Sequence, residues 1–497
     1  MRKYLMRFIL ALCASLIVIF AVGQSDHMSQ EISSSHEDSV VVAAGKLYKA
    51  SGTKRFFFGD HYRKAWATGI KVPVANLKEI KGGLNILEPG GGMQTYSLKL
   101  EANTTKLYAF RSIQKDPSPV LPRPVKPTFF ADLVQDQISA AHPYGAFILP
   151  PLARAAGIYH TNPKLYYLPD SEELGQYQKK FGGMLMMLEE DADEDWSHKK
   201  SFGFTENAVS TETVIEELLE ENENYVDEAF LLRARLFDMW IGDWDRHEGQ
   251  WRWAELKDNQ DHKMFRPIPE DRDNAFFKFD GFFPWWIRRK WALRKFQKFD
   301  DDIRDIAGLN DNARHFDRRF LSSLDREQWL YEARILQKNL TDEVIESAVR
   351  QWPDEIYALN GAEIISHLQE RRTKLHEFAN RYYDILAREV DIHGSDESEY
   401  FEVIRKNNRE TQVRIYDLSK EEKDELLFDR TFFSDETKEI RLYGFADDDV
   451  FDVNGNVQNG IKVRLIGGDG QDRFNDNSTV AGISKQTIIY DLPDSEL

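Results

Sequence analysis

Acidic and amide side chains gather near the middle of the chain, in two short segments. The segments are Gly242-Asp-Trp-Asp-Arg-His-Glu-Gly-Gln250 and Pro269-Glu-Asp-Arg-Asp-Asn-Ala-Phe276. Phosphoryl transfer from a nucleotide needs a carboxylate that orients and deprotonates the acceptor, an amide that holds Mg²⁺, and a second carboxylate that bridges metal and phosphates. The two segments offer these groups in that order, namely Asp245 or Asp243, then Gln250, then Asp271 or Asp273.

The same residues permit two other interpretations. With Asp243, Asp245 and Asp271 beside it, His247 could help to hold the divalent ions of a metal-dependent phosphoesterase. Alternatively, the Asp-x-Asp-Arg-His stretch is a buried network of arginine and carboxylates that joins two helices. We expect Arg246 and His247 to support the loop rather than to react.

The two segments resemble the catalytic and metal loops of atypical kinases, notably type II phosphatidylinositol 4-kinases, HipA-like kinases and the secretory-pathway casein kinases. Their shared pattern is Asp-Arg-(His or Gly), then an Asn, then Asp-Asn-Gly-x-(Ala or Gly)-Phe. The resemblance implies that Asp245 is the catalytic Asp and that Gln250 takes the place of the metal-binding Asn. Asp271 would be the metal-binding Asp, with Asp273 as the alternative.

An upstream stretch resembles the Gly-rich hairpin and the nucleotide-binding strand of a kinase. It consists of Gly90-Gly-Gly-Met-Gln-Thr-Tyr-Ser-Leu-Lys99 and Leu107-Tyr-Ala-Phe-Arg-Ser-Ile-Gln-Lys-Asp-Pro117. Glycines there let backbone N–H groups approach phosphates without a Cβ in the way. The resemblance implies a nucleotide site of three parts: Gly90, Gly91 and Gly92 over the phosphates, Arg111 or Lys115 as the phosphate-binding cation paired with Asp136, and a hinge at Glu189.

The patterns around these segments predict the elements that position them. Alternating residues such as Leu98 and Leu100 predict strands. Helical apolar stripes run along residues 227–240, directly before the first acidic segment, and along residues 368–386. Combined with the resemblance, they predict an α+β, bilobal, atypical protein-kinase-like fold, with a β-rich N-lobe over residues 46–190 and a helical C-lobe over residues 191–390.

The apolar residues alternate again after Asp391, which predicts a small all-β module over residues 391–497, cut from a larger β structure. Gly467-Gly-Asp-Gly-Gln-Asp-Arg-Phe474 fits one turn of the β-roll repeat that binds Ca²⁺, and a looser copy ends at Phe451, 23 residues earlier. Asp469 and Asp472 are therefore candidate Ca²⁺ ligands. We favour turn chemistry in a stacked β module over calcium binding.

The N-terminus predicts export. A basic start, an apolar run from Phe8 to Val22 and small residues before Gln24 have the layout of a signal peptide over residues 1–23. Residues 24–45 are polar and rich in Ser and Glu, which predicts a disordered lead-in. Cys13 is the single cysteine, so the mature chain would have no disulfide and no cysteine nucleophile. The formal net charge of −19 argues against nucleic-acid binding.

From Phe58 onward the chain is similar to the middle region of large exported Gram-negative proteins. In those proteins a calcineurin-like phosphoesterase precedes this region and a BamA/TamA-like outer-membrane barrel follows it. The resemblance rests on five stretches: Phe58-Gly-Asp-His-Tyr-Arg-Lys-Ala-Trp66, Gly90-Gly-Gly-Met-Gln-Thr95, Ala141-His-Pro-Tyr144, Gly242-Asp-Trp-Asp-Arg-His247 and Gln250-Trp-Arg-Trp253. It implies a periplasmic or outer-membrane-associated protein that does not span the membrane, with a barrel or another envelope protein as partner.

Two observations bear on activity. Arg111 and Gln250 replace two of the residues that are diagnostic for kinases, and compartments beyond the inner membrane are expected to be poor in ATP. We therefore predict a degenerate kinase-like domain that acts as a binding or accessory module of an outer-membrane-associated system. The alternatives are an active phosphotransferase that uses Mg²⁺ and a nucleotide, and a metal-dependent phosphoesterase.

Overall fold

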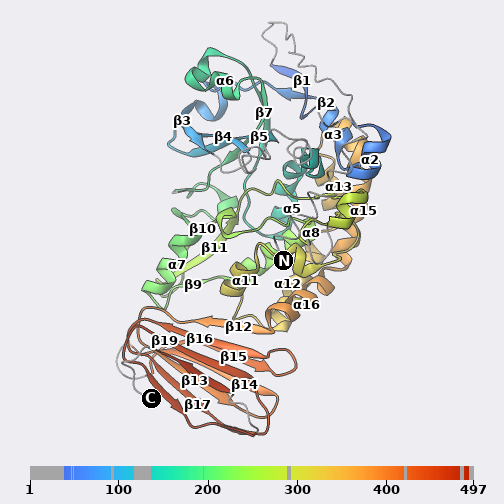
Figure 1. The fold of residues 1–497 in the computed structure, drawn as a ribbon. Helices are drawn as coiled ribbons and strands as arrows, with labels where there is room; N and C mark the ends of the chain where they lie inside the picture. The colour runs from blue at the N-terminus through green and yellow to red at the C-terminus, as the bar shows by residue number, and fades with distance from the viewer. Residues whose placement is uncertain are drawn as a thin grey trace, which may run out of the picture. The chain divides into compact units, whose positions relative to one another are not determined.

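The computed structural model describes residues 38–45, 48, 50–90, 95–116, 136–193, 195–287, 293–418, 423–481 and 486–491. Ser39 to Leu497 form one compact unit, shown in Figure 1. The predicted signal peptide lies outside the described residues, as does most of the predicted lead-in. Within the described ranges, no helix is long and apolar enough to cross a membrane.

The first described element lies inside the segment that its composition predicts to be disordered. β1 (Ser39–Ala43) pairs in antiparallel fashion with β2 (Gly69–Pro73). The short helices α2 (Gly52–Phe58) and α3 (Arg63–Ala67) lie between these strands. Pairing with β2 explains why Ser39–Ala43 is ordered, because the partner strand satisfies its backbone groups.

A five-stranded antiparallel sheet follows, in the order β3-β4-β5-β7-β6. Its strands are β3 (Leu84–Gly90), β4 (Thr95–Ala102), β5 (Leu107–Lys115), β6 (Lys164–Leu168) and β7 (Met184–Glu190), and α5 (Leu149–Ala156) and α6 (Gln178–Phe181) lie in the connections. The predicted alternation is confirmed at Leu98 and Leu100, which are both buried. β5 lies in the middle of the sheet, with β4 on one side and β7 on the other.

The helix that leads into the first acidic segment is α8 (Glu228–Ile241), as the apolar stripe predicts. Its N-cap is Asp227, whose side chain accepts a hydrogen bond from the Phe230 N–H. It ends at Gly242, which has a φ of +73° and would bring a Cβ within 2.8 Å of the Phe299 ring. Glycine is therefore required where the chain turns into the acidic segment.

The region that the patterns predict to be helical also contains a four-stranded sheet, in the order β8-β10-β11-β9. Its strands are β8 (Asn207–Ser210), β9 (Tyr225–Val226), β10 (Trp251–Lys257) and β11 (Lys263–Pro269). The β10–β11 hairpin joins the two acidic segments, with Trp251 opposite Pro269. Trp251 and Trp253 are buried and alternate with the less buried Arg252, and both rings pack against Phe316 of α11 (Arg314–Phe320). This alternation with a period of two residues is that of a strand.

The helices of this region are α7 (Thr211–Glu220), α8, α9 (Phe282–Ile287), α10 (Ile306–Leu309), α11 (Arg314–Phe320), α12 (Arg326–Asn339), α13 (Asp342–Val349), α14 (Asp354–Ile356), α15 (Ala362–Thr373) and α16 (Leu375–Leu386). The stripe predicted along residues 368–386 is divided between α15 and α16, which meet at Lys374. Leu368, Leu375 and Phe378 of that stripe are fully buried in the main apolar core.

The C-terminal part of the described chain is a coil in which most neighbouring strands are parallel and two strand pairs are antiparallel (Figure 1). It has its own apolar core. Its strands are β12 (Glu389–His393), β13 (Glu399–Arg405), β14 (Glu410–Asp417), β15 (Leu426–Phe433), β16 (Glu439–Phe445), β17 (Val450–Asn454), β18 (Asn456–Val457), β19 (Lys462–Gly468), β20 (Arg473–Asp476), β21 (Thr479–Val480) and β22 (Thr487–Tyr490). They form sheets with the orders β12-β16-β19-β22 and β15-β14-β13-β17-β20, and β18 pairs with β21.

The 23-residue spacing found in the sequence is one turn of this coil. Phe451 lies directly opposite Phe474 in the parallel pair β17–β20, and the two rings stack with centroids 5.0 Å apart. Phe401 of β13 extends the stack, 4.5 Å from Phe451. Identical residues at equivalent positions thus pack on one another along the coil, which is how repeated strands bury a continuous core.

Candidate functional site

The two cations predicted for β5 meet the two acids that follow β11. Arg111 Nη1 lies 3.4 Å from Asp271 Oδ1, and Lys115 Nζ lies 2.5 Å from Asp273 Oδ2. The register of β5 on β4 is irregular between residues 111 and 115, and both side chains nevertheless reach the acids after β11. The structure therefore brings two cations and two acids together from segments that are far apart in the sequence, as the motifs predict for one site.

Burial and charge act on these four groups in different ways. Burial by itself raises the pKa of Asp271, but Arg111 and Lys115 outweigh it and hold that pKa below its usual value. Burial and the neighbouring Asp271 carboxylate raise the pKa of Asp273 to about 6. Burial lowers the pKa of Lys115, but Asp273 and Asp271 more than offset this and raise it. The site is a compact group of opposite charges in which Asp271 is the acid most firmly held in its ionised form.

Glu189 lies on β7, the strand next to β5, with its Oε2 3.9 Å from Arg111 Nη1. Its Oε1 accepts a hydrogen bond of 2.5 Å from the Thr161 hydroxyl. Burial raises the pKa of Glu189 to about 8, although Arg111 lowers it. Glu189 thus faces the phosphate-binding candidate, so its side chain is an acid partner of Arg111.

Asp136 does not have the role that the sequence suggested. Its carboxylate accepts two hydrogen bonds of 2.6 Å from Arg63 and pairs with Lys54 at 2.8 Å. The pairing of Asp136 with Arg111 is therefore wrong. Asp136 is already engaged by Arg63 and Lys54, and the acids that lie beside Arg111 are Asp271 and Glu189.

The first acidic segment presents Asp243 and Asp245 in different states. Asp243 is 2 % exposed, and one of its oxygens accepts a hydrogen bond from the Asp245 N–H at 3.1 Å. Its other oxygen has no hydrogen-bond partner among the described residues. Burial raises the pKa of Asp243 to about 7, against the opposing effect of Arg246. Asp245 is less buried, and its Oδ1 accepts a 2.6 Å hydrogen bond from the Asn312 amide.

Gln250 lies beside this segment but is already occupied. Arg246 Nη1 donates to the Gln250 side-chain oxygen at 2.9 Å and to the Glu270 carbonyl at 2.7 Å, while its Nη2 donates to the Gln250 carbonyl at 3.0 Å. Arg246 is 1 % exposed and lies over the Trp251 ring, so it supports the loop as predicted. The amide oxygen that would coordinate Mg²⁺ is thus used to hold Arg246.

Asp238 was not among the residues predicted for the site, although it contacts Arg246 of the first acidic segment and Arg272 of the second. This fully buried acid of α8 accepts hydrogen bonds from Arg235 at 3.0 Å and Arg272 at 2.9 Å and pairs with Arg246 at 3.2 Å. Burial by itself raises the pKa of Asp238, but the three guanidinium groups outweigh it and keep the pKa low. Asp238 could have been recognised from its place within an apolar helical stripe, because a buried acid needs a buried partner.

Asn312, in the turn between α10 and α11, was missed as well. Its amide bridges two groups, since it donates to Asp245 and accepts from Lys295 Nζ at 3.2 Å. Nothing in the local sequence marks Asn312, because its neighbours in the site come from other parts of the chain. Asn312 thus places an amide beside Asp245, the predicted catalytic acid, whereas the Gln250 amide oxygen is engaged by Arg246.

The predicted Gly-rich hairpin is described in part. Gly90 ends β3 opposite Ser97, and Ser97 lies opposite Arg111 in the next strand pair. Gly90 is therefore aligned with the cation of β5 across the sheet. Gly91 and Gly92 lie outside the described residues.

The two Ca²⁺ candidates have different surroundings. Asp469 is exposed, whereas Asp472 is fully buried and accepts a hydrogen bond from the Asp449 N–H at 3.0 Å. A Cβ on Gly467 would lie 2.1 Å from the second oxygen of Asp472, so that oxygen packs against the glycine backbone. That oxygen has no hydrogen-bond partner among the described residues, so the preference for turn chemistry over Ca²⁺ binding stays a prediction.

In the described part of the chain, one set of three His or acidic side chains has its ligand atoms within 4.8 Å of one another: Glu223, His262 and Glu425. None of the predicted metal ligands belongs to it. His247, in particular, is not gathered with Asp243, Asp245 and Asp271 in such a set. Its Nδ1 accepts from the Gly249 N–H at 3.2 Å, which uses the imidazole to close its own turn.

No protein-family model and no curated protein matches the chain. Among solved structures, the chain is similar to an amicoumacin kinase in complex with AMP-PNP and Ca²⁺, at 10% sequence identity. The match covers 61% of this chain and 90% of the kinase, with a TM-score of 0.18. A TM-score of this size is too low to assign a fold or an activity to this chain.

Proposed function

We propose that the protein is an exported, kinase-like domain that no longer transfers phosphoryl groups and acts as a binding or accessory module in the cell envelope. The observation that carries this proposal is that both acids of the metal loop are paired with the cations of β5, at 3.4 Å and 2.5 Å. In an active kinase these acids would bind Mg²⁺ and the cation would bind phosphate. Here each side neutralises the other.

Gln250 supports the same proposal. Its side-chain oxygen accepts from Arg246, and Arg246 is in turn fixed by the fully buried Asp238. Releasing the amide for a metal would leave a buried guanidinium short of one acceptor, which is costly. The site thus has neither a free metal-binding amide nor a free metal-binding acid in this arrangement.

An active Mg²⁺-dependent phosphotransferase is the second candidate. It is favoured by the Asn312 amide, 2.6 Å from Asp245, which could take the part of the missing metal-binding Asn after a small side-chain rotation. In this version a nucleotide and Mg²⁺ would displace the cation–acid pairs. Arg111 would then bind phosphate, Asp271 and Asp273 would bind metal, and Asp245 would orient the acceptor.

A thermal-shift titration separates the two candidates. The mature chain is titrated with ATP and with ADP, each in Mg²⁺ and in EDTA, and ADP production is followed in parallel. The degenerate module is expected to show no Mg²⁺-dependent shift and no ADP production. A Mg²⁺-dependent shift that Asp271→Asn abolishes, while Glu216→Gln on the exposed face of α7 retains it, would overturn the proposal in favour of the enzyme.

A repaired variant tests the reason for the lost activity. Arg111→Lys combined with Gln250→Asn restores the two residues that differ from the kinase pattern. If the altered residues are what disable the site, this variant gains a Mg²⁺-dependent shift that the wild type lacks. A repaired variant that folds normally and still binds no nucleotide would show that the site was never of the kinase type.

The envelope location and the partner are part of the proposal. The N-terminal basic and apolar layout supports export, and the similarity from Phe58 onward to regions that precede an outer-membrane barrel supports such a barrel as partner. Cell fractionation of a tagged chain tests the location. A chain found with the cytoplasmic fraction, and with an uncleaved N-terminus, would contradict it.

A further inference from the structure

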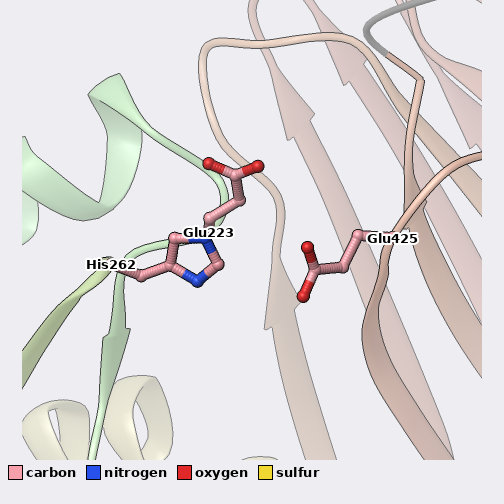
Figure 2. Close-up of side chains that lie close together, drawn as sticks. All are labelled: Glu223, His262 and Glu425. Carbon is pink, nitrogen blue, oxygen red and sulfur yellow. The ribbon is translucent and has the colours of Figure 1, made fainter. Parts of the chain in front are cut away.

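A second group of polar residues lies at the contact between the four-stranded sheet and the C-terminal strands. Glu223 follows α7, His262 lies in the β10–β11 turn, and Glu425 directly precedes β15. One ligand atom from each lies within 4.8 Å of the others, and Figure 2 shows the Glu425 side chain extending from the C-terminal strands toward His262. One imidazole and two carboxylates therefore converge from three separate loops.

Asp258 lies beside the imidazole of His262. Asp258 Oδ1 accepts hydrogen bonds from the Gln260 N–H at 2.8 Å and the His262 N–H at 3.0 Å, which fixes the carboxylate in the turn. Its Oδ2 lies 3.6 Å from His262 Nδ1. A carboxylate beside one ring nitrogen is the arrangement that holds a metal-binding histidine in place and leaves the other nitrogen for the metal.

The loops that carry the two glutamates are fixed by neighbouring hydrogen bonds. Asn222, next to Glu223, donates from its backbone N–H to Glu397 and from its side chain to Asp417, each at 3.1 Å. The Asp417 N–H donates to the Glu425 carbonyl at 2.9 Å. The backbones of Glu223 and Glu425 are thus held near each other by the same residues, which lowers the entropic cost of gathering ligands.

The charges at this place do not balance. Among the residues that the structure describes, neither the Glu223 nor the Glu425 carboxylate has an ion-pair partner, and Asp258 adds a third acid beside His262. Like charges held close together repel each other unless a cation lies between them. A divalent cation would remove this repulsion and would connect the C-terminal strands to the rest of the molecule.

We propose that Glu223, His262 and Glu425 form a site for a divalent transition metal of the Zn²⁺ type. A nitrogen ligand with two carboxylates suits Zn²⁺, whereas Mg²⁺ and Ca²⁺ take oxygen ligands. Metal–ligand bonds of about 2.0–2.2 Å require the ligand atoms to lie within roughly 4 Å of one another. Rotation of the two glutamate side chains closes the remaining gap, and water fills the fourth position.

The first test measures binding directly. The untagged mature chain, stripped with chelator, is titrated calorimetrically with Zn²⁺, Mg²⁺ and Ca²⁺, and bound metal is counted after dialysis. We expect one Zn²⁺ per chain and no comparable binding of Mg²⁺ or Ca²⁺. His262→Ala and Glu425→Gln should each lose this Zn²⁺, while His376→Ala, an exposed histidine of α16, should keep it. No stoichiometric Zn²⁺, or Zn²⁺ retained by both site variants, overturns the proposal.

Asp258→Asn gives a graded test that depends on positioning. Because it leaves all three ligands in place and removes only the carboxylate beside His262, it should weaken Zn²⁺ binding by about 10–100-fold. Unchanged affinity in a folded Asp258→Asn chain would show that His262 is not held as described and would contradict the site. The proposed Zn²⁺ ligands and Asp258 are separate from Arg111 and Asp271. The nucleotide titration of the His262→Ala, Glu425→Gln and Asp258→Asn chains should therefore match that of the wild type, whether or not the wild type binds a nucleotide.

Discussion

Two regions of the molecule bury carboxylates, and the surroundings act on the charge of these carboxylates in different ways. Asp238 of α8 lies among Arg235, Arg246 and Arg272, and their charges hold its pKa below the usual value against the effect of burial. In the C-terminal coil, Glu399 and Asp449 are equally buried, and burial raises the pKa of Glu399 to about 7 and that of Asp449 to about 9. In the first region arginines outweigh the effect of burial on the pKa, and in the second region burial outweighs the hydrogen bonds and favours the protonated acid.

The difference follows from what each carboxylate does. Asp238 is part of a network that joins the two acidic segments, and guanidinium groups can reach it from three loops at once. Along the coil, Asp449 accepts a hydrogen bond from the Glu399 N–H and Asp472 accepts one from the Asp449 N–H, while Glu399 accepts from the Ser395 N–H. A protonated acid is sufficient there, because the backbone donor needs only an acceptor.

The largest expected effect comes from removing the acid of the arginine network. Asp238→Ala leaves three guanidinium groups buried around a missing charge, so we expect a loss of about 3–5 kcal/mol in the free energy of unfolding. Urea unfolding measures it, with Glu216→Gln on the surface of α7 as the control. A loss below about 1 kcal/mol would mean that the network does not hold the two segments together.

A smaller effect is expected in the coil. Asp449→Ala removes the acceptor of the Glu399 N–H but leaves no charge unpaired, so we expect a loss of about 1–3 kcal/mol. The matched control is Asp435→Ala, whose partner Arg409 is exposed and 3.4 Å away, and which should cost less than about 1 kcal/mol. If Asp449→Ala cost as much as Asp238→Ala, the contrast between the two regions would be lost.

A third prediction concerns pH and has a definite sign. The pKa of Asp449 is raised to about 9 in the folded chain, and an unfolded Asp has a pKa of about 4. The folded coil therefore binds a proton that the unfolded chain releases. Its stabilising contribution is complete below about pH 4 and is lost as the pH rises toward 9. Asp238, with its lowered pKa, contributes in the opposite sense and loses its effect only in acid.

Hydrogen exchange of the β13 and β17 amides between pH 5.5 and 8.5 tests this sign. After correction for intrinsic exchange, protection in the wild type should decrease with rising pH. Asp449→Asn mimics the protonated acid, so its protection should depend less on pH than that of the wild type. Equal pH dependence in the two proteins would show that Asp449 is ionised in the folded coil.

Local patterns were sufficient for several features. The stripe that ends in Gly242 predicted α8, the alternation of Leu98 and Leu100 predicted a strand, and the 23-residue spacing predicted stacked strands. Each of these signals is repeated along one stretch of chain, so it does not depend on knowing a distant partner. The gathering of Arg111, Lys115, Asp271 and Asp273 was also predicted, from the order of motifs rather than from any one of them.

Features that depend on distant partners were not predictable in the same way. The four-stranded sheet within the mainly helical region has two short outer strands, β8 and β9. They are distant in sequence from each other and join the β10–β11 hairpin only through backbone pairing. Asp136 was assigned to the wrong cation, because an acid shows no preference in sequence between Arg63 and Arg111. Asn312 and the set around His262 gave no local signal at all.

The sequence by itself determined which residue types are available for chemistry and the order in which the elements present them. Only the tertiary structure decided their state: Arg111 and Lys115 pair with Asp271 and Asp273, and Gln250 holds Arg246. Arginines lower the pKa of Asp238, whereas burial raises the pKa of Asp449. The physical reason is that the charge of a buried group depends on which opposite charges lie within a few ångströms. Those neighbours are set by how the chain folds on itself, and they are seldom neighbours in sequence.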